Sequence, residues 1–201
     1  SLEALGLGRR LASYLGAALT GVVVADATTL DRGELTKILG RHGADRVLWS
    51  IGHGPTEPMI FATHGAVIST VCQLVRPALV LVAATPGGHD LAPRLAVRFG
   101  AAFVEEASLA VGPSGELLLG RAGRVGSAAI RLGAADGARM IVATVTPHSA
   151  MKAAGDREPE VIEIRAPEPV SPPLEEVSRA PDLAATLDEA RVVVTAGAGV
   201  S

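Results

Sequence analysis

The sequence predicts an α/β protein with a three-layer, doubly wound sheet and added antiparallel strands. Short runs rich in valine and leucine alternate with longer amphipathic segments over the first hundred residues, which is the pattern of repeated strand–helix units. The clearest run, 78–84, is apolar throughout rather than at alternate positions. Continuous apolarity is typical of a parallel strand that helices cover on both faces.

The first hundred residues divide into helices and strands of predictable bounds. We expect helices at 2–15, 30–39, 59–75 and 91–99, and strands at 19–25, 46–49 and 78–84. Glycines 16, 40 and 100 mark helix ends, and Pro77 ends the third helix. Residues 22–24, 47–48 and 79–82 are the expected central parallel strands, with Val80 and Leu81 largely buried. Because the chain opens on a helix, we expect the first strand of the alternation to lie upstream of Ser1.

After Gly100 the pattern changes to short extended runs separated by turn residues. Runs at 109–111 and 117–119 flank Pro113-Ser114-Gly115, which predicts a hairpin. We expect 127–132 and 140–146 to form a second pair and 161–164 a further strand, all as antiparallel additions. Four prolines within 166–173 predict an extended linker. The expected organisation is an α/β domain at 1–166, a linker at 167–190 and the start of a second domain at 191–201.

Composition excludes several classes of function. Hydrophobic residues make up 48% and charged residues 19%, so the chain is globular. A net charge of -3 gives no electrostatic basis for nucleic-acid binding. The single cysteine, Cys72, precludes an internal disulfide and is expected to be a buried, inert thiol. No run is long enough to span a bilayer and no signal peptide opens the chain, so we expect a cytoplasmic location without membrane insertion.

Two glycine-containing segments are candidate ligand sites. The loop 85–90 follows the strongest strand, where ligands of open α/β sheets bind, although its glycines can equally serve a turn and Asp90 a helix cap. His89 in that loop is a candidate base without a partner placed by the sequence. Gly197 and Gly199 follow the valine run 191–195, and a glycine turn after a strand favours phosphate binding. Motifs of P-loop enzymes, serine hydrolases and zinc peptidases are absent, and the adjacent carboxylates Glu105 and Glu106 are expected to be solvated.

The chain resembles the alpha subunit of electron-transfer flavoproteins. The resemblance rests on the runs PALVLVAAT at 77–85 and GHDLAPRLA at 88–96, with GADRV at 43–47, ATV at 143–145 before Pro147, and LDEARVVV at 187–194 before Gly197 and Gly199. The order and spacing of these runs hold over nearly the whole chain. Four residues depart from the family pattern: His89, Thr146 and Ala198 stand where the family usually has arginine, and Arg124 stands in a segment that usually has an aromatic residue and paired glycines.

The resemblance implies a fold and a function. The fold is that of the adenine nucleotide alpha hydrolase-like domains. The full alpha subunit holds FAD in its C-terminal domain, pairs with a beta subunit, and passes electrons from dehydrogenases to another redox protein. The present chain would then be the scaffold and interface domain, an electron-carrier subunit rather than an enzyme, with Gly197, Gly199 and Ser201 at the start of the FAD site. By itself it is not expected to hold FAD, because most of that site lies beyond Ser201.

Two other classes of function stay open on the sequence alone. The first is an adenine-nucleotide hydrolase or ligase on a related sheet, which needs a phosphate-binding loop after its first strand. That strand is expected upstream of Ser1, so the upstream residues would discriminate. The second is a stand-alone interaction module, which would be favoured if the gene ended at Ser201.

Overall fold

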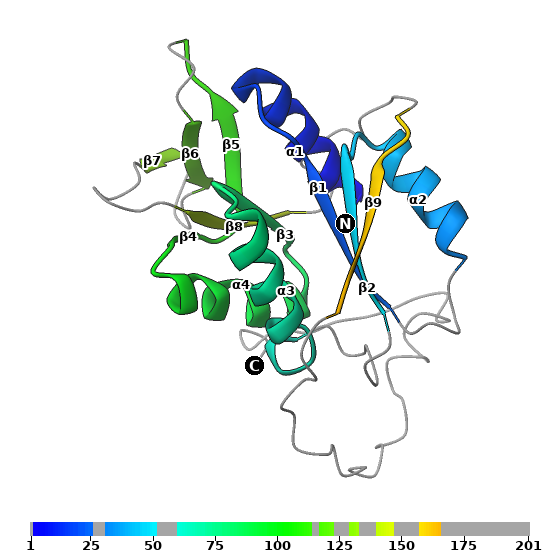
Figure 1. Ribbon diagram of the computed structural model, residues 1–201. Helices are drawn as coiled ribbons and strands as arrows, with labels where there is room; N and C mark the ends of the chain where they lie inside the picture. Colours follow the sequence, from blue (N-terminus) through cyan, green and yellow to red (C-terminus); the bar gives the residue numbers. More distant parts are fainter. Residues whose placement is uncertain are drawn as a thin grey trace, which may run out of the picture. The chain divides into compact units, whose positions relative to one another are not determined.

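The structure, a computed structural model, describes residues 2–25, 31–51, 60–113, 117–122, 129–132, 140–146 and 157–165 (Figure 1). All of these belong to one unit, Ser1–Val170. The helices are α1 Leu2–Leu15, α2 Arg32–Arg41, α3 Phe61–Val75 and α4 Pro86–Phe99. The strands are β1 Thr20–Ala25, β2 Arg46–Ile51, β3 Leu79–Ala83, β4 Ala102–Val104, β5 Ala107–Val111, β6 Leu117–Ala122, β7 Ala129–Leu132, β8 Ile141–Val145 and β9 Glu160–Ile164.

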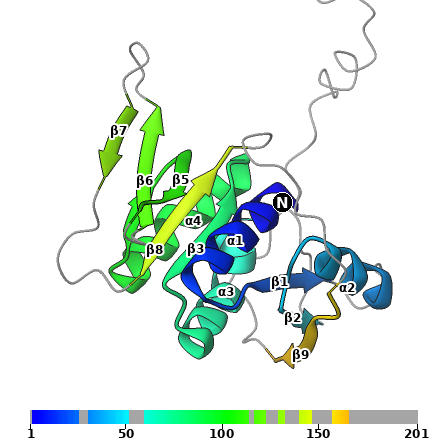
Figure 2. The same cartoon turned by 90° about the horizontal axis from the view of Figure 1, so that it is seen from above.

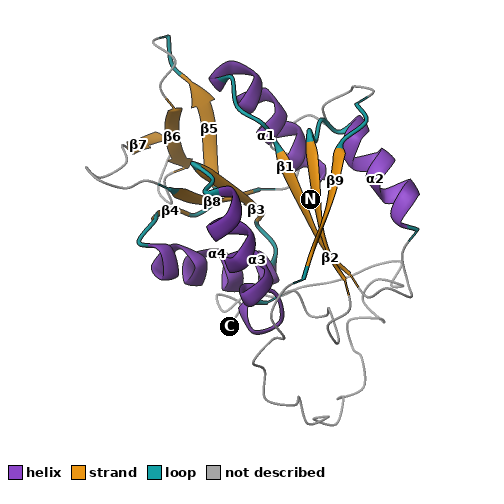
Figure 3. Cartoon of the chain, in the orientation of Figure 1, coloured by secondary structure: helices purple, strands orange, loops and turns teal. Residues whose placement is uncertain are grey.

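The described strands form three sheets of three strands each (Figure 3). Two sheets are parallel throughout, with the strand orders β1-β2-β9 and β3-β8-β4. The third, β5-β6-β7, is antiparallel and lies beside β8 (Figure 2). The α/β class with parallel strands, flanking helices and antiparallel additions is therefore confirmed.

The second half of the chain pairs differently from the prediction. The hairpin of β5 and β6 forms as expected, but β7 pairs with β6 rather than with the run at 140–146. That run, β8, lies parallel between β3 and β4, and β9 lies parallel beside β2. The prediction of antiparallel additions was wrong for β8 and β9, because a strand that returns to a parallel sheet after a long excursion has the same short apolar pattern as a hairpin strand.

Strand β3 is not central among the described strands. Its residues are half-buried, Val80 and Leu81 included, and β8 holds the central position of the sheet. Val142, Ala143 and Thr144 of β8 are completely buried. The prediction of a central β3 was therefore wrong, and Val80 and Leu81, predicted to be largely buried, are half-buried, although helices and strands do cover both faces of β3.

Side chains of the sheet β3-β8-β4 alternate between two packed faces. Val80, Val82 and Val142 face helix α4, where they contact Ala92 and Ala96. The opposite face packs against α1 and the antiparallel sheet, through contacts among Leu7, Leu11, Leu79, Leu81, Leu109 and Leu117. In the other parallel sheet, Val47 and Trp49 pack against leucines of both α1 and α2. The cores on the two sides of α1 are thus joined through that helix.

The segment 85–90 is not a loop. Helix α4 begins at Pro86, and Thr85 is its N-cap, with a hydroxyl that accepts from the N–H of Gly88 at 3.2 Å. The prediction of a helix from residue 91 was wrong because two adjacent glycines normally disfavour a helix. Proline at the first helical position and a threonine cap before it outweigh that preference here.

Two of the three predicted glycine stops act as such. Gly16 and Gly100 follow α1 and α4 with positive φ angles of 62° and 59°, a conformation that glycine adopts without strain. Gly40 does not end α2, which continues to Arg41 with His42 as its C-cap. Gly40 instead permits close packing, because a Cβ there would lie 2.1 Å from the carbonyl oxygen of Arg157.

Candidate functional site

The residues predicted to begin the FAD site lie outside the described part of the chain. These residues are Gly197, Gly199 and Ser201. Ala198, Arg124 and the whole predicted linker 167–190 also lie outside the described residues. Their role stays a prediction. The candidate sites that can be built from atoms are the carboxyl end of β3, the buried titratable groups, and the charged surface around α2.

At the carboxyl end of β3, the polar side chains of α4 hold helices and turns together. The Asp90 carboxylate accepts the N–H of Phe61 at 2.8 Å, and Arg94 one turn later donates to it at 2.9 Å. Phe61 is the first residue of α3, so Asp90 caps α3 rather than its own helix. The prediction that Asp90 caps the helix that follows it was wrong. Asp90 lies inside that helix, α4, and caps the neighbouring helix α3.

His89 lies on the same turn, and its side chain contacts a carboxylate. Its Nδ1 atom lies 3.3 Å from the carboxylate of Glu105, which belongs to the turn between β4 and β5. None of the side-chain hydrogen bonds and ion pairs in the described part of the chain joins His89 to a serine, a cysteine or a second histidine. The arrangement is a partly exposed contact between α4 and a turn, so Glu105 is more than the solvated carboxylate that the sequence indicated. Thr146, the other described departure from the family pattern, is exposed.

Burial controls the two titratable groups of α3. Burial lowers the pKa of His64, whose side chain lies 2.8 Å from the Thr63 hydroxyl, so the imidazole is neutral near pH 7. Burial raises the pKa of Cys72 to about 11, and its side chain is 5% exposed. Both effects favour the uncharged form, which suits groups that serve packing.

Cys72 is therefore expected to resist thiol reagents in the folded protein. At pH 8 a thiol with a pKa of about 11 has only about one thiolate in a thousand, and the thiolate is the reactive form. We expect negligible reaction with Ellman's reagent in buffer and one equivalent of reaction in denaturing urea. One equivalent released within minutes in buffer would contradict the burial of this residue.

Asp45 joins three segments that are distant in sequence. Its carboxylate accepts from the Arg9 guanidinium at 2.6 Å, from Arg157 at 2.7 Å and from the Leu19 N–H at 2.8 Å. Burial alone would raise its pKa, but these donors outweigh burial and lower the pKa below its ordinary value. Sequence reasoning identified Asp45 only as part of the GADRV run; the structure shows that it ties α1, β1 and the approach to β9 together.

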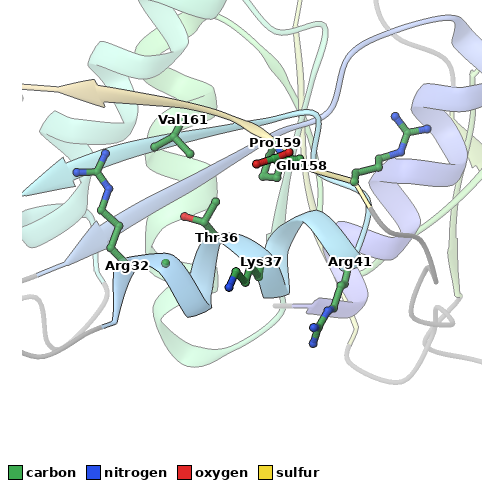
Figure 4. A pocket seen from close by; sticks show the side chains of 9 residues that line it. Arg32, Thr36, Lys37, Arg41, Glu158, Pro159 and Val161 are labelled. Carbon is green, nitrogen blue, oxygen red and sulfur yellow. The ribbon is translucent and has the colours of Figure 1, made fainter.

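A groove of about 770 Å³ lies between α2 and the first part of β9 (Figure 4). Its lining is cationic: Arg32, Lys37, Arg41 and Arg157 stand against one carboxylate, Glu158. Sequence analysis did not find this site, because Arg157 lies more than a hundred positions after the three cations of α2, and only the pairing of β9 with β2 brings it to them. No cluster of His, Cys, Asp or Glu suited to a metal ion occurs among the described residues.

Comparison with known protein families identifies the chain's relatives. Residues 1–169 match the family described as "Electron transfer flavoprotein domain". The chain belongs to this family. The family match covers every described element from α1 to β9, so the parallel sheets and their helices are the electron transfer flavoprotein domain itself.

Three individual proteins align with about half of this chain. The chain is 35% identical over 101 residues to "Electron transfer flavoprotein subunit alpha" of Clostridium acetobutylicum and 37% identical over 101 residues to "Protein FixB" of Clostridium saccharobutylicum. It is 33% identical over 99 residues to "Acryloyl-CoA reductase electron transfer subunit beta" of Anaerotignum propionicum. These alignments cover 48–49% of this chain and 25–28% of the relatives. The aligned region thus spans about a quarter of the length of each relative.

The electron transfer flavoprotein domain described here has no helix that combines the length and the apolarity needed for a membrane span. Asp45, Asp90 and His89 each make a polar contact that joins one structural element to another.

Proposed function

We propose that this chain is the scaffold and subunit-interface domain of an electron-transfer flavoprotein alpha subunit. In its full form, such a subunit carries electrons through FAD between dehydrogenases and a redox acceptor. The match of residues 1–169 to the family carries this proposal, and the likeness to an alpha subunit and to FixB supports the choice of subunit. Asp45 and Asp90 support the scaffold role, because the carboxylate of Asp45 binds Arg9 of α1 and that of Asp90 binds the first N–H of α3.

The proposed partner is a beta subunit, and exposed apolar side chains support an interface. Tyr14, Leu74 and Val97 are 76%, 66% and 84% exposed, and each lies in the last turn of a helix, α1, α3 or α4. Large aliphatic and aromatic side chains in water favour association when a partner covers them. Each helix leads into a parallel strand, so these side chains lie near the amino ends of β1, β3 and β4.

The flavin is proposed to require more than this chain. FAD needs several backbone N–H groups for its pyrophosphate, best supplied by a glycine turn that runs into a helix. Gly197, Gly199 and Ser201 would begin such a turn, with Ala198 in place of the usual arginine and thus without a charge-assisted contact. Most of a bound small molecule is normally buried, roughly 70–90% of its surface, and three residues at a turn cannot bury that much of FAD.

A single preparation tests both parts of this function. Purified alone, the chain is expected to be colourless, without flavin absorbance, and co-expressed with an electron-transfer flavoprotein beta subunit it is expected to form a one-to-one complex by light scattering. Co-expression with a serum albumin fragment of about the size of the beta subunit serves as the control for non-specific association. A yellow chain with stoichiometric FAD, or a monomer indifferent to the beta subunit, would overturn the proposal.

A further inference from the structure

Two of the four cations that line the groove between α2 and β9 make no ion pair in the described part of the chain, and the lining holds one carboxylate, Glu158. Arg32 pairs with Glu163 and lies 5.5 Å above the ring of Trp49, and Arg157 pairs with Asp45. Lys37 and Arg41 are both exposed and, in the described part of the chain, neither makes a hydrogen bond or ion pair. These two lie one turn apart on α2, so they repel each other and gain from an anionic partner.

The β9 side of the groove is an open strand edge. Within the described residues β9 pairs only with β2, which leaves its other edge without a neighbouring strand. The N–H of Glu160 points to the β2 side, where it donates to the backbone carbonyl of Asp45 at 3.0 Å. Since N–H directions alternate along a strand, the N–H groups of Val161 and Glu163 point to the open edge. Val161 and Ile162 are 40% and 36% exposed, so the strand presents aliphatic side chains as well as backbone groups at this edge.

The spacing of the cations matches that of side chains on an extended peptide. With a rise of about 1.5 Å per residue, Arg32 and Lys37 are about 7.5 Å apart along α2, and Lys37 and Arg41 about 6 Å. Side chains on one face of a strand repeat every ~6.8 Å. The ion pair of Glu163 with Arg32 shows that a carboxylate on a strand at this edge can reach a cation of α2. A strand added beside β9 would place every second side chain toward the same helix face.

We propose that this groove docks an extended, acidic segment of a partner protein, which adds a strand to the open edge of β9. Backbone hydrogen bonds to the edge supply affinity, and carboxylates at alternate positions pair with Lys37 and Arg41. This inference is independent of the proposed function, since it rests on side chains of α2 and the edge of β9 and uses none of the exposed apolar residues at the helix ends.

The geometry favours an acidic peptide over a small phosphate ligand. Phosphate sites in proteins gather donors on one point, often a helix N-terminus. The N-terminus of α2 already holds the carboxylate of Asp31, which accepts the N–H of Glu34 at 3.0 Å and disfavours a second anion. The cations are instead distributed along roughly 13.5 Å of helix, from Arg32 to Arg41.

Fluorescence anisotropy with labelled peptides tests the proposal. The probe is an acetylated and amidated Glu-Val-Glu-Val-Glu peptide, compared with a Glu-Glu-Glu-Val-Val peptide of equal charge and a Lys-Val-Lys-Val-Lys peptide. The alternating acidic peptide is expected to bind most tightly at low salt, and the lysine peptide not at all. Equal binding of both acidic peptides, or displacement of the probe by equimolar pyrophosphate, would overturn strand addition.

Variants separate the charge of α2 from the edge of β9. Lys37→Glu with Arg41→Glu is expected to weaken probe binding about tenfold or more, because two attractions become repulsions. Val161→Pro, which removes an outward N–H at an edge position that tolerates proline, is expected to weaken binding about fivefold. The matched control is Arg10→Glu with Arg98→Glu, two exposed arginines of α1 and α4. Equal losses in the control, or none in Val161→Pro with its thermal unfolding unchanged, would refute the proposal.

Discussion

Replacing Gly88 with alanine is expected to lower the free energy of unfolding by about 3 kcal/mol. Gly88 lies in the first turn of α4, where the helix approaches the end of β3. A Cβ at this position would lie 1.9 Å from the carbonyl oxygen of Ala83 and 3.1 Å from a methyl of Val82. Backbone atoms of a paired strand cannot move aside cheaply, so the helix must shift away from the sheet. Urea unfolding followed by circular dichroism measures the effect.

Gly33→Ala provides the matched control for this prediction. Gly33 also lies in the first turn of a helix, α2, but it is exposed, and its added Cβ would meet only Asp31 Oδ1 at 3.4 Å. Alanine is the better helix former, so stability is expected to stay unchanged or to rise by up to ~1 kcal/mol. If Gly88→Ala behaved like Gly33→Ala, the close contact of α4 with β3 would be wrong.

Replacing Asp45 with alanine is expected to cost about 2–3 kcal/mol at pH 7. The change leaves the Leu19 N–H without its acceptor and the guanidinium of Arg9, whose side chain is 13% exposed, without its counter-charge. It also frees Arg157 and so loosens the approach to β9. Chemical unfolding of the variant and the parent chain gives the difference in free energy.

The cost of the Asp45 substitution is expected to vanish in acid. The pKa of Asp45 is lowered in the folded protein, so the carboxylate's stabilisation is complete above the pKa of the unfolded chain. This stabilisation is lost as the pH falls through the lowered pKa of Asp45 in the folded protein, because the carboxyl group then binds a proton and no longer forms ion pairs. The two unfolding curves should therefore differ at pH 7 and converge as the pH falls below the ordinary aspartate pKa and through the lowered pKa of Asp45.

Glu160→Gln is the control for the charge effect. Its carboxylate pairs with Arg46 at 3.1 Å, but the two side chains are 61% and 50% exposed. Exposed pairs of this kind contribute between zero and about 1 kcal/mol. A loss in Glu160→Gln as large as that in Asp45→Ala would show that surface charge in general, rather than the bonded Asp45, accounts for the stability.

Local sequence patterns determined much of the fold of this protein. Helix α1 and strand β1 are fixed by apolar periodicity, and Gly16 and Gly100 end their helices because the left-handed backbone there suits glycine. The family runs identified the electron transfer flavoprotein domain, since a run such as 88–96 combines several residues that each serve a different contact. Asp90 illustrates this, because its partner Phe61 lies 29 residues earlier and no local rule connects them.

Only the tertiary structure decided which strands are neighbours and what surface they create. The apolar run of β8 is compatible with a hairpin or a parallel sheet, and its complete burial between β3 and β4 settles the choice. The groove beside α2 depends on β9 lying next to β2, a pairing across more than a hundred residues. Pairing over such distances depends on which apolar faces remain to be covered once the local elements have formed, so the sequence of a single element cannot specify it.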